Sequence, residues 1–189
     1  MIGIDEVGRG AWAGPLVVGG CYFIENPGFI RGLNDSKKLS ARKRLELDNQ
    51  IKSSTLFYIV EITPKEIDTY GLTYCTRKAI VEIVRHMPTD ALIMLDGKFN
   101  YLKGTEFETR SQVVIGADGL YVPVMAASII AKVARDNIMK EYATRFPQYG
   151  FEKHVGYGTK FHRAALLNYG VTSIHRLSFK PVSEIGVLV

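Results

Sequence analysis

Acidic residues follow three apolar runs of strand length in this 189-residue chain. The runs are Met1–Ile4 before Asp5 and Glu6, Ala91–Leu95 before Asp96, and Val113–Ala117 before Asp118. In an open α/β sheet, ligands bind outside the strand ends, where acids from distant parts of the sequence can converge. Clustered carboxylates repel one another unless a cation neutralises them, and their oxygen atoms suit Mg²⁺ or Mn²⁺. Two such ions about 4 Å apart would support in-line phosphoryl transfer.

Each of these signals also has a simpler interpretation. An Asp-Gly pair after a strand, as at Asp96 and Asp118, is a common turn sequence. Adjacent residues on a regular strand face opposite sides of the sheet, so Asp5 and Glu6 converge only where the strand ends or kinks. The glycines of the Gly8–Gly10 segment would permit such a kink. The pattern by itself therefore leaves a metal site and a set of turns both open.

A glycine-rich segment, Gly8 to Pro15, joins the first two apolar runs. Its spacing, Gly8-x-Gly10-x-x-x-Gly14, is one residue too long for the dinucleotide-binding fingerprint, and it precedes a strand, which excludes a Rossmann nucleotide site. Glycines let a backbone approach a ligand closely, and successive N–H groups can hold a phosphate or a sugar hydroxyl. A tight connection between two strands is the alternative interpretation.

The elements that would position these residues alternate between strands and helices. Apolar, β-branched runs predict strands at Met1–Ile4, Leu16–Ile24, Leu56–Ile62, Ala91–Leu95 and Val113–Ile115. Helical spacing and cap residues predict helices at Ser40–Ile51, from Thr63-Pro64 onward, and at Thr73–Met87, Val122–Phe146 and Thr159–Tyr169. This order predicts a single sheet with helices, of the α/β or α+β class.

The composition narrows the class of protein. Hydrophobic residues make up 47% of the chain, which excludes a disordered protein, and the length suits one domain. Cys21 and Cys75 have no zinc-ligand spacing, no apolar run reaches the length of a membrane span, and the N-terminus does not resemble a signal peptide. A cytoplasmic protein is therefore expected.

The net charge of +5 is unevenly distributed. Residues 31–53 and residues 132–163 each carry seven basic and three acidic residues. Either segment alone is typical of a solvated helix face. The two together favour a polyanionic partner.

Several motifs resemble those of bacterial ribonuclease HII. They are Gly3-Ile4-Asp5-Glu6-Val7-Gly8-Arg9-Gly10, Leu33-Asn34-Asp35-Ser36-Lys37-Lys38-Leu39-Ser40, Leu95-Asp96-Gly97, Gly116-Ala117-Asp118, the run from Ala126 to Asp136, Tyr149-Gly150-Phe151, Gly156-Tyr157-Gly158-Thr159 and His175-Arg176-Leu177-Ser178-Phe179. They extend from Gly3 to about Val182, nearly the whole chain. So many motifs in one order are highly specific.

The resemblance implies an α/β, RNase H-like fold: a mixed sheet flanked by helices, in one catalytic domain of residues 1–189 whose segment from about 145 to 189 is helical. It implies an endoribonuclease that hydrolyses RNA in RNA–DNA hybrids. It also implies cutting on the 5′ side of single ribonucleotides embedded in duplex DNA, with 5′-phosphate and 3′-hydroxyl ends. The implied catalytic residues, which hold Mn²⁺ or Mg²⁺ and activate water, are Asp5, Glu6, Asp96 and Asp118.

The resemblance also indicates which residues bind the substrate. The Gly8-Arg9-Gly10 turn would sense the ribonucleotide, because its backbone could contact a 2′-hydroxyl, and the Tyr157 ring would pack on the neighbouring sugar. Residues expected to face phosphates are Asn34, Ser36, Lys37, Lys38 and Lys132. A solvated surface role is the alternative for each basic residue. No clamp-binding tail is evident after Phe179, and a monomer is expected.

The chain departs from the family pattern at a few positions. Ala11-Trp12 stands where Pro-Leu is common, Val155 replaces a lysine before Gly156, and Lys98-Phe99 replaces a shorter polar residue. None of these changes removes a catalytic acid. They therefore bear on affinity and substrate preference and not on the reaction.

Two other classes of function compete with a nuclease. The basic segments argue against a metal-dependent phosphatase acting on a small substrate, and the presence of all four acids argues against a nucleic-acid-binding module with vestigial acids.

Trp12 is expected in the core and His154 on a solvated loop. His162 and His175 have no spacing typical of a zinc site, and Asp136 is expected in a structural ion pair.

Overall fold

The structure, a computed structural model, describes residues 1–24, 30, 32–34 and 36–186. The motif residue Asp35, part of the first basic segment, and the last three positions of the chain lie outside the described residues. Two compact units interleave along the sequence. Unit 1 comprises Met1–Val7, Val17–Val60 and Thr76–Val133, and unit 2 comprises Gly8–Leu16, Glu61–Cys75 and Ala134–Val189. The expected single domain stays a prediction.

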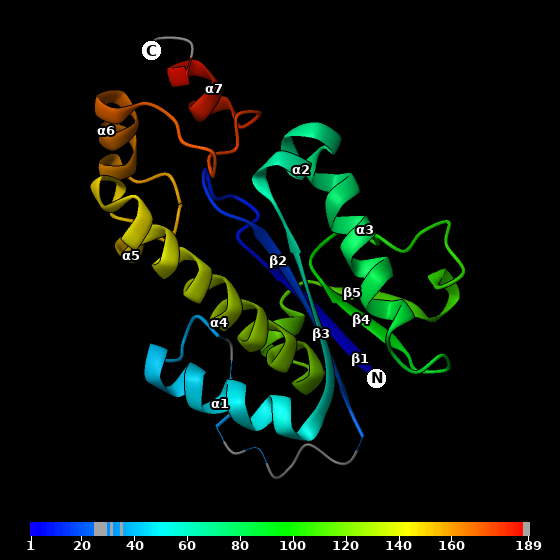
Figure 1. Cartoon of the computed structure of the whole chain (residues 1–189). Helices are drawn as coiled ribbons and strands as arrows, with labels where there is room; N and C mark the ends of the chain where they lie inside the picture. The colour runs from blue at the N-terminus through cyan, green and yellow to red at the C-terminus, as the bar shows by residue number, and fades with distance from the viewer. Residues whose placement is uncertain (25–29, 31, 35, 187–189) are drawn as a thin grey trace. The chain divides into compact units, whose positions relative to one another are not determined.

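Among the described residues, five strands form one mixed sheet, almost entirely within unit 1, in the order β3-β2-β1-β4-β5 (Figure 1). The strands are β1 (Ile2–Val7), β2 (Leu16–Phe23), β3 (Thr55–Ile62), β4 (Ile93–Asp96) and β5 (Ser111–Val114). β1 pairs antiparallel with β2 and parallel with β4, and β4 pairs parallel with β5. The predicted mixed sheet is confirmed, although β4 begins after the predicted Ala91 and β5 before the predicted Val113.

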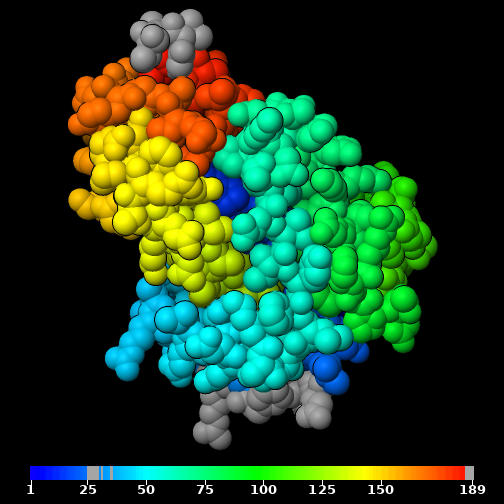
Figure 2. Space-filling view, viewed as in Figure 1, coloured from blue at the N-terminus to red at the C-terminus, as the bar shows by residue number. Residues whose placement is uncertain are grey.

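Helices and 3-10 turns complete unit 1. They are α1 (Ala41–Ser54), α3 (Leu72–Arg85), the first half of α4 (Val122–Arg145), η2 (Glu108–Arg110) and η3 (Ala117–Gly119). α1 begins at the predicted cap Ser40, whose hydroxyl accepts a hydrogen bond from the Lys43 N–H at 3.2 Å. Leu47 and Ile51 of α1 share an apolar cluster with Ile129 of α4. The outer side of α1 lies on the surface shown in cyan in Figure 2.

The helices α3 and α4 cover opposite faces of the sheet (Figure 1). A Cβ atom added at Gly19 of β2 would lie 2.7 Å from the Ala127 carbonyl oxygen of α4. A Cβ atom added at the adjacent Gly20 would lie 2.2 Å from Ile83 of α3. Successive residues of a strand face opposite sides, so β2 needs a small residue toward each helix. Two neighbouring glycines thus let both helices approach the sheet closely.

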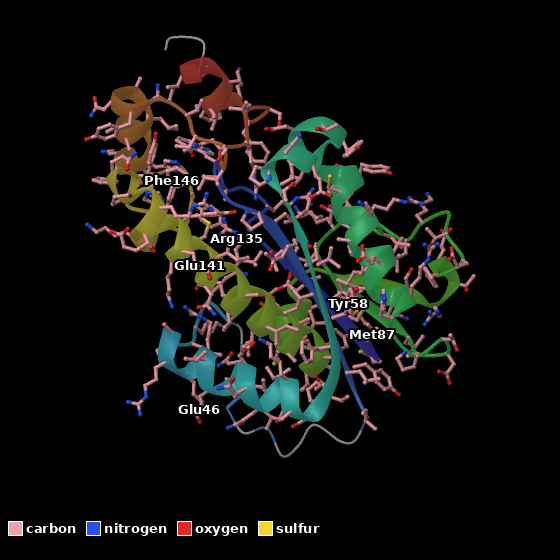
Figure 3. The ribbon with its side chains drawn as sticks, viewed as in Figure 1. Glu46, Tyr58, Met87, Arg135, Glu141 and Phe146 are labelled. Atoms are coloured by element: carbon pink, nitrogen blue, oxygen red, sulfur yellow. The ribbon has the colours of Figure 1, made fainter. Side chains whose placement is uncertain are left out.

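Unit 2 consists of short helices around an aromatic core. Besides the second half of α4, its helices and turn are α2 (Pro64–Tyr70), η4 (Pro147–Tyr149), α5 (Phe151–His154), α6 (Lys160–Tyr169) and α7 (Lys180–Gly186). The rings of Tyr149 and Phe151 are buried and stack with their centroids 5.4 Å apart. Phe146, labelled in Figure 3, meets Tyr149 edge-on at 6.5 Å. No helix in the described part of the chain is long and apolar enough to cross a membrane.

Candidate active site

Three of the four predicted acids come together in unit 1. Asp5, Asp96 and Asp118 each offer a carboxylate oxygen, and these atoms lie within 4.8 Å of one another. Asp5 is on β1 and Asp96 ends the adjacent parallel strand β4, so both reach the same edge of the sheet. Asp118 follows β5 through Gly116, whose φ of 74° turns the chain into η3. The Ala117 N–H donates to Asp96 Oδ1 at 2.8 Å and thereby ties this turn to β4.

Burial strongly affects the carboxylate of Asp5. Only 8% of it is exposed, and this burial, together with the neighbouring charges of Asp96 and Glu6, raises its pKa to about 7. A hydrogen bond with the Ser128 hydroxyl on α4 acts in the opposite direction. The Ser128 hydroxyl also lies 2.8 Å from the buried Ser36 hydroxyl. Ser36 therefore holds Ser128, and Ser128 in turn holds the Asp5 carboxylate through a hydrogen bond.

The aspartate cluster fits a divalent metal ion. It offers hard oxygen donors on a rigid strand edge, which is the donor set that Mg²⁺ and Mn²⁺ prefer. Burial, as the largest cause, and the neighbouring charges of Asp96 and Glu6 both disfavour the ionised form of Asp5 and so raise its pKa. A cation among Asp5, Asp96 and Asp118 would remove that repulsion. The roles of these residues as metal ligands stay predictions.

Glu6 does not belong to the cluster formed by the three aspartates. β1 continues regularly to Val7, with Asp5 opposite Gly19 and Glu6 opposite Val18. The kink that would bring Asp5 and Glu6 together is therefore not present, and the two side chains leave opposite faces of the strand. The Glu6 N–H donates to Asp5 Oδ1 at 2.8 Å, so its backbone helps to orient Asp5. A metal-binding role for the Glu6 side chain stays a prediction.

The residues predicted to face phosphates occupy different environments. Lys37 is largely exposed, and its ammonium group lies 3.2 Å from Asp118 Oδ2. Asn34 and Lys38 are exposed, and Lys132 is half-buried. Ser36 is 3% exposed and is bonded to Ser128, which favours a role in supporting Asp5 over direct contact with a phosphate.

The glycine-rich segment belongs to unit 2, where it leads into β2 as predicted. Gly8 to Ala11 form a turn closed by a hydrogen bond from the Ala11 N–H to the Gly8 carbonyl at 3.2 Å. Gly8 has a φ of 88°, and a Cβ atom there would lie 2.1 Å from Arg135 Nε. A side chain at this position is therefore excluded by both conformation and space. Arg135, labelled in Figure 3, extends from α4 to this segment.

Tyr157 also belongs to unit 2, and 38% of it is exposed. The guanidinium carbon of Arg135 lies 5.5 Å from the centre of its ring. Trp12 packs against the aromatic core as expected, and it needs Gly158, where a Cβ atom would lie 2.1 Å from the indole ring. The bulky ring that departs from the family pattern is thus accommodated by a glycine beside Tyr157.

His154 was expected on a solvated loop, and that expectation is wrong. It is 8% exposed, its Nε2 lies 2.8 Å from the Tyr149 carbonyl oxygen, and its ring stacks on His162 at 4.6 Å. His162 Nε2 lies 3.0 Å from His175 Nε2, and both rings are buried. His162 Nδ1 lies 3.0 Å from the Tyr157 carbonyl oxygen, so the cluster supports the backbone of Tyr157.

These hydrogen bonds fix one proton on each histidine. The N–H groups of Gly156 and Thr172 donate to Nδ1 of His154 and His175, so both rings carry their proton on Nε2. His162 then accepts from His175 and donates through Nδ1 to Tyr157. Burial, as the largest cause, lowers the pKa of His162 and of His175 to about 4, which agrees with neutral rings at these two positions.

Sequence reasoning missed Ser128, Arg176 and the role of Arg135. A hydroxyl in the otherwise apolar run Ala126-Ala127-Ser128-Ile129-Ile130 was an available signal for a buried polar contact. Arg135 and Arg176 are both fully buried. Their acceptors are backbone carbonyls, which every residue possesses, so no sequence signal could have identified these contacts.

Comparison with known proteins gives consistent matches over almost the whole chain. The family model of ribonuclease HII matches residues 2–182. A ribonuclease HII of Aliarcobacter butzleri is 43% identical over 192 residues, which cover 99% of this chain and 96% of that protein. The solved ribonuclease H2 of Pyrococcus horikoshii OT3 has a TM-score of 0.84 at 26% identity. The match covers 99% of this chain and 97% of that protein's chain. The ribonuclease HII of Archaeoglobus fulgidus, solved in complex with PCNA, has a TM-score of 0.83 at 28% identity. This match covers 97% of this chain and 95% of that protein's chain.

Proposed function

The chain belongs to the ribonuclease HII family, and from this premise we propose how its residues carry out that family's reaction, the endonucleolytic hydrolysis of RNA in RNA–DNA hybrids. We propose further that it cuts on the 5′ side of a single ribonucleotide embedded in duplex DNA, leaving 5′-phosphate and 3′-hydroxyl ends. The observation that carries the proposal is the convergence of Asp5, Asp96 and Asp118 at one edge of the sheet.

The three aspartates supply the binding site for divalent metal ions, with Glu6 as the fourth acid. Two divalent cations held there would neutralise the carboxylates and stabilise negative charge developing on the scissile phosphate. Asp5 has to be ionised to bind a cation, and the hydrogen bond from Ser128 favours its ionised form. Ser36 holds Ser128, so both serines orient Asp5 without contacting the substrate.

The basic residues of unit 1 bind the phosphodiester backbone. Lys37 lies beside Asp118 and is largely exposed, so its ammonium group can exchange this carboxylate for a phosphate oxygen. Lys38 and Asn34 are exposed near it in sequence and contribute further contacts. Such contacts hold the duplex in register but do not distinguish RNA from DNA.

The distinction between RNA and DNA falls to unit 2. A 2′-hydroxyl both donates and accepts hydrogen bonds, and the backbone of the Gly8-Arg9-Gly10 turn offers partners of both kinds. The exposed ring of Tyr157 packs on the neighbouring sugar, and a deoxyribose there fits it better because it has no 2′-hydroxyl. Selectivity for the RNA-to-DNA junction therefore depends on small neutral groups.

A labelled duplex with one ribonucleotide tests the proposal. Cleavage on the 5′ side of that ribonucleotide is expected with Mn²⁺ or Mg²⁺, and EDTA should abolish it. An all-DNA duplex of the same sequence is the matched control. Asp5→Asn should bind the duplex but not cut it. Metal-independent cutting, or full activity of Asp5→Asn, would refute the assignment of the metal site.

A further inference from the structure

Two arginines are completely buried in unit 2. Arg135 and Arg176 each have 0% exposed surface. Burial, as the largest cause, lowers the pKa of Arg135, and it lowers the pKa of Arg176 to about 9. Burying a guanidinium group carries a large desolvation cost, which other interactions must offset. The acceptors of these two groups therefore indicate what the arginines do.

Both guanidinium groups donate to carbonyls of the segment from Arg9 to Pro15. Arg176 Nη1 donates to the Arg9 carbonyl at 3.0 Å, and its Nε and Nη2 donate to the Gly14 carbonyl at 3.1 and 2.9 Å. Arg135 donates to the Pro15 carbonyl at 2.9 Å and to the Ala13 carbonyl at 3.2 Å. Within the described part of the chain, no carboxylate accepts a hydrogen bond from either group. The arginines thus hold the backbone of this segment from the inside.

The bond to the Arg9 carbonyl has a consequence for the next residue. A trans peptide is planar, and its C=O and N–H point in opposite directions. Since the Arg9 carbonyl points toward Arg176, the Gly10 N–H points away from it. Gly10 is exposed, and a Cβ atom added there would meet nothing within 4 Å. Among the described residues, no backbone hydrogen bond from the Gly10 N–H is found.

We propose that Arg176 is a positioning residue for substrate selection: by holding the Arg9 carbonyl, it presents the Gly10 N–H outward as a donor to the 2′-hydroxyl oxygen of the ribonucleotide. The inference rests on the proposed function, because it takes the turn to be the part that senses ribose. Lysine cannot replace Arg176, because an ammonium group is a point charge without the planar fork that spans two carbonyls.

Arg135 extends the same arrangement to Tyr157. It donates to the Ala13 and Pro15 carbonyls on either side of Gly14, which Arg176 holds. Its guanidinium carbon also lies 5.5 Å from the centre of the Tyr157 ring, and its Nη1 has no hydrogen-bond partner among the described residues. A guanidinium group over a ring face is attracted by the π electrons of the ring. Arg135 therefore fixes the ring and the turn to one another within unit 2.

Binding measurements in EDTA test the role of Arg176 apart from cleavage. The dissociation constants are compared for a duplex with one ribonucleotide and for an all-DNA duplex of the same sequence. Arg176→Lys should lower the preference for the ribonucleotide by roughly fivefold to tenfold, the effect of one hydrogen bond, while affinity for the all-DNA duplex stays the same. Arg85→Lys, an exposed arginine of α3 that pairs with Glu106, is the matched control and should keep the preference.

The wild-type protein provides a second measurement in case Arg176→Lys does not fold. The Gly10 amide, followed by nitrogen-15 NMR, should gain protection from hydrogen exchange with the ribonucleotide duplex and not with the all-DNA duplex. Equal protection by both duplexes would identify a phosphate as the acceptor and overturn the proposal. Protection by neither duplex would also overturn it.

The outcomes separate this inference from the proposed function. A wild-type protein that neither prefers nor cuts the ribonucleotide duplex would refute the proposed function. A wild-type protein that cuts it, together with a folded Arg176→Lys that keeps the full preference, would refute the role of Arg176 alone.

Discussion

Replacing Asp5 with asparagine should make the metal-free protein more stable while removing its activity. Asparagine has nearly the shape of a protonated aspartic acid and can keep the hydrogen bond with Ser128. It carries no charge, so it escapes both causes that raise the pKa of Asp5: burial, and repulsion by Asp96 and Glu6. In the proposed function the buried carboxylate of the wild type binds metal, and the same carboxylate works against folding when no metal is bound.

The size of this loss in the free energy of unfolding follows from the pKa of Asp5. The folded-state pKa of Asp5 is about 7, above its ordinary value of 3.8, so between these values the folded protein holds a proton that the unfolded chain has released. Stability is therefore lost as the pH rises from about 4 to 7. Above pH 7 the ionised Asp5 lowers the free energy of unfolding by on the order of 4 kcal/mol in total. About 2 kcal/mol of this loss develops between pH 5.5 and pH 8.

Urea unfolding in EDTA measures this effect in wild type and Asp5→Asn at both pH values. The variant should be the more stable protein at pH 8, and its advantage should shrink by about half at pH 5.5. His162 and His175 are the same in both proteins, so the pH dependence that they contribute cancels in the comparison. Adding Mn²⁺ should stabilise the wild type more than the variant. An advantage that does not change with pH, or a less stable variant, would refute the electrostatic account of Asp5.

Three further changes test other parts of the molecule. Tyr157→Ala should reduce cutting at a single ribonucleotide by roughly tenfold and cutting of a long hybrid by less, because only the former depends on the junction; rates on both substrates check this. Gly158→Ala should destabilise the protein by about 1–3 kcal/mol in urea unfolding, since its Cβ would lie 2.1 Å from Trp12, and Trp12→Leu should restore stability. Acid should loosen unit 2. The pKa of His162 and of His175 is about 4, below the unfolded value of 6.5, so their contribution is complete above pH 6.5 and is lost as the pH falls through 4. The free energy of opening, obtained from amide protection factors corrected for the intrinsic exchange rate at each pH, should be lower at pH 4.5 than at pH 7 by on the order of 2 kcal/mol per histidine.

Much of the sheet and part of the site could be predicted from the sequence. Local chemistry determines the start of α1, because Ser40 is a good cap wherever the rest of the chain lies. The convergence of Asp5, Asp96 and Asp118 was expected from the rule that strand ends meet at one edge, although β1 continues past Asp5 to Val7. That rule does not specify the direction of each side chain, and Glu6 accordingly lies outside the aspartate cluster.

The parts that escaped prediction depend on contacts between distant residues. His154 looks like a loop residue in sequence, and only its stacking on His162 and its bond to Tyr149 show that it is buried. Arg135 lies next to Asp136 in sequence, yet the carbonyls of the distant residues Ala13 and Pro15 accept its hydrogen bonds. Such contacts involve the backbone and carry no residue-type signature.

The order of strands in the sheet has a consequence for how each new chain matures. β1 is made first, but its parallel partner β4 pairs Ile93 with Ile2, so this partner emerges from the ribosome much later. At a synthesis rate of about 5–20 residues per second, one edge of β1 stays unpaired for several seconds until β4 has been made. An apolar strand with a free edge is a template for association with other chains. Because β1 carries Asp5 and β4 carries Asp96, the pairing that covers the free edge of β1 also brings together the first two of the three aspartates, before β5 and Asp118 follow.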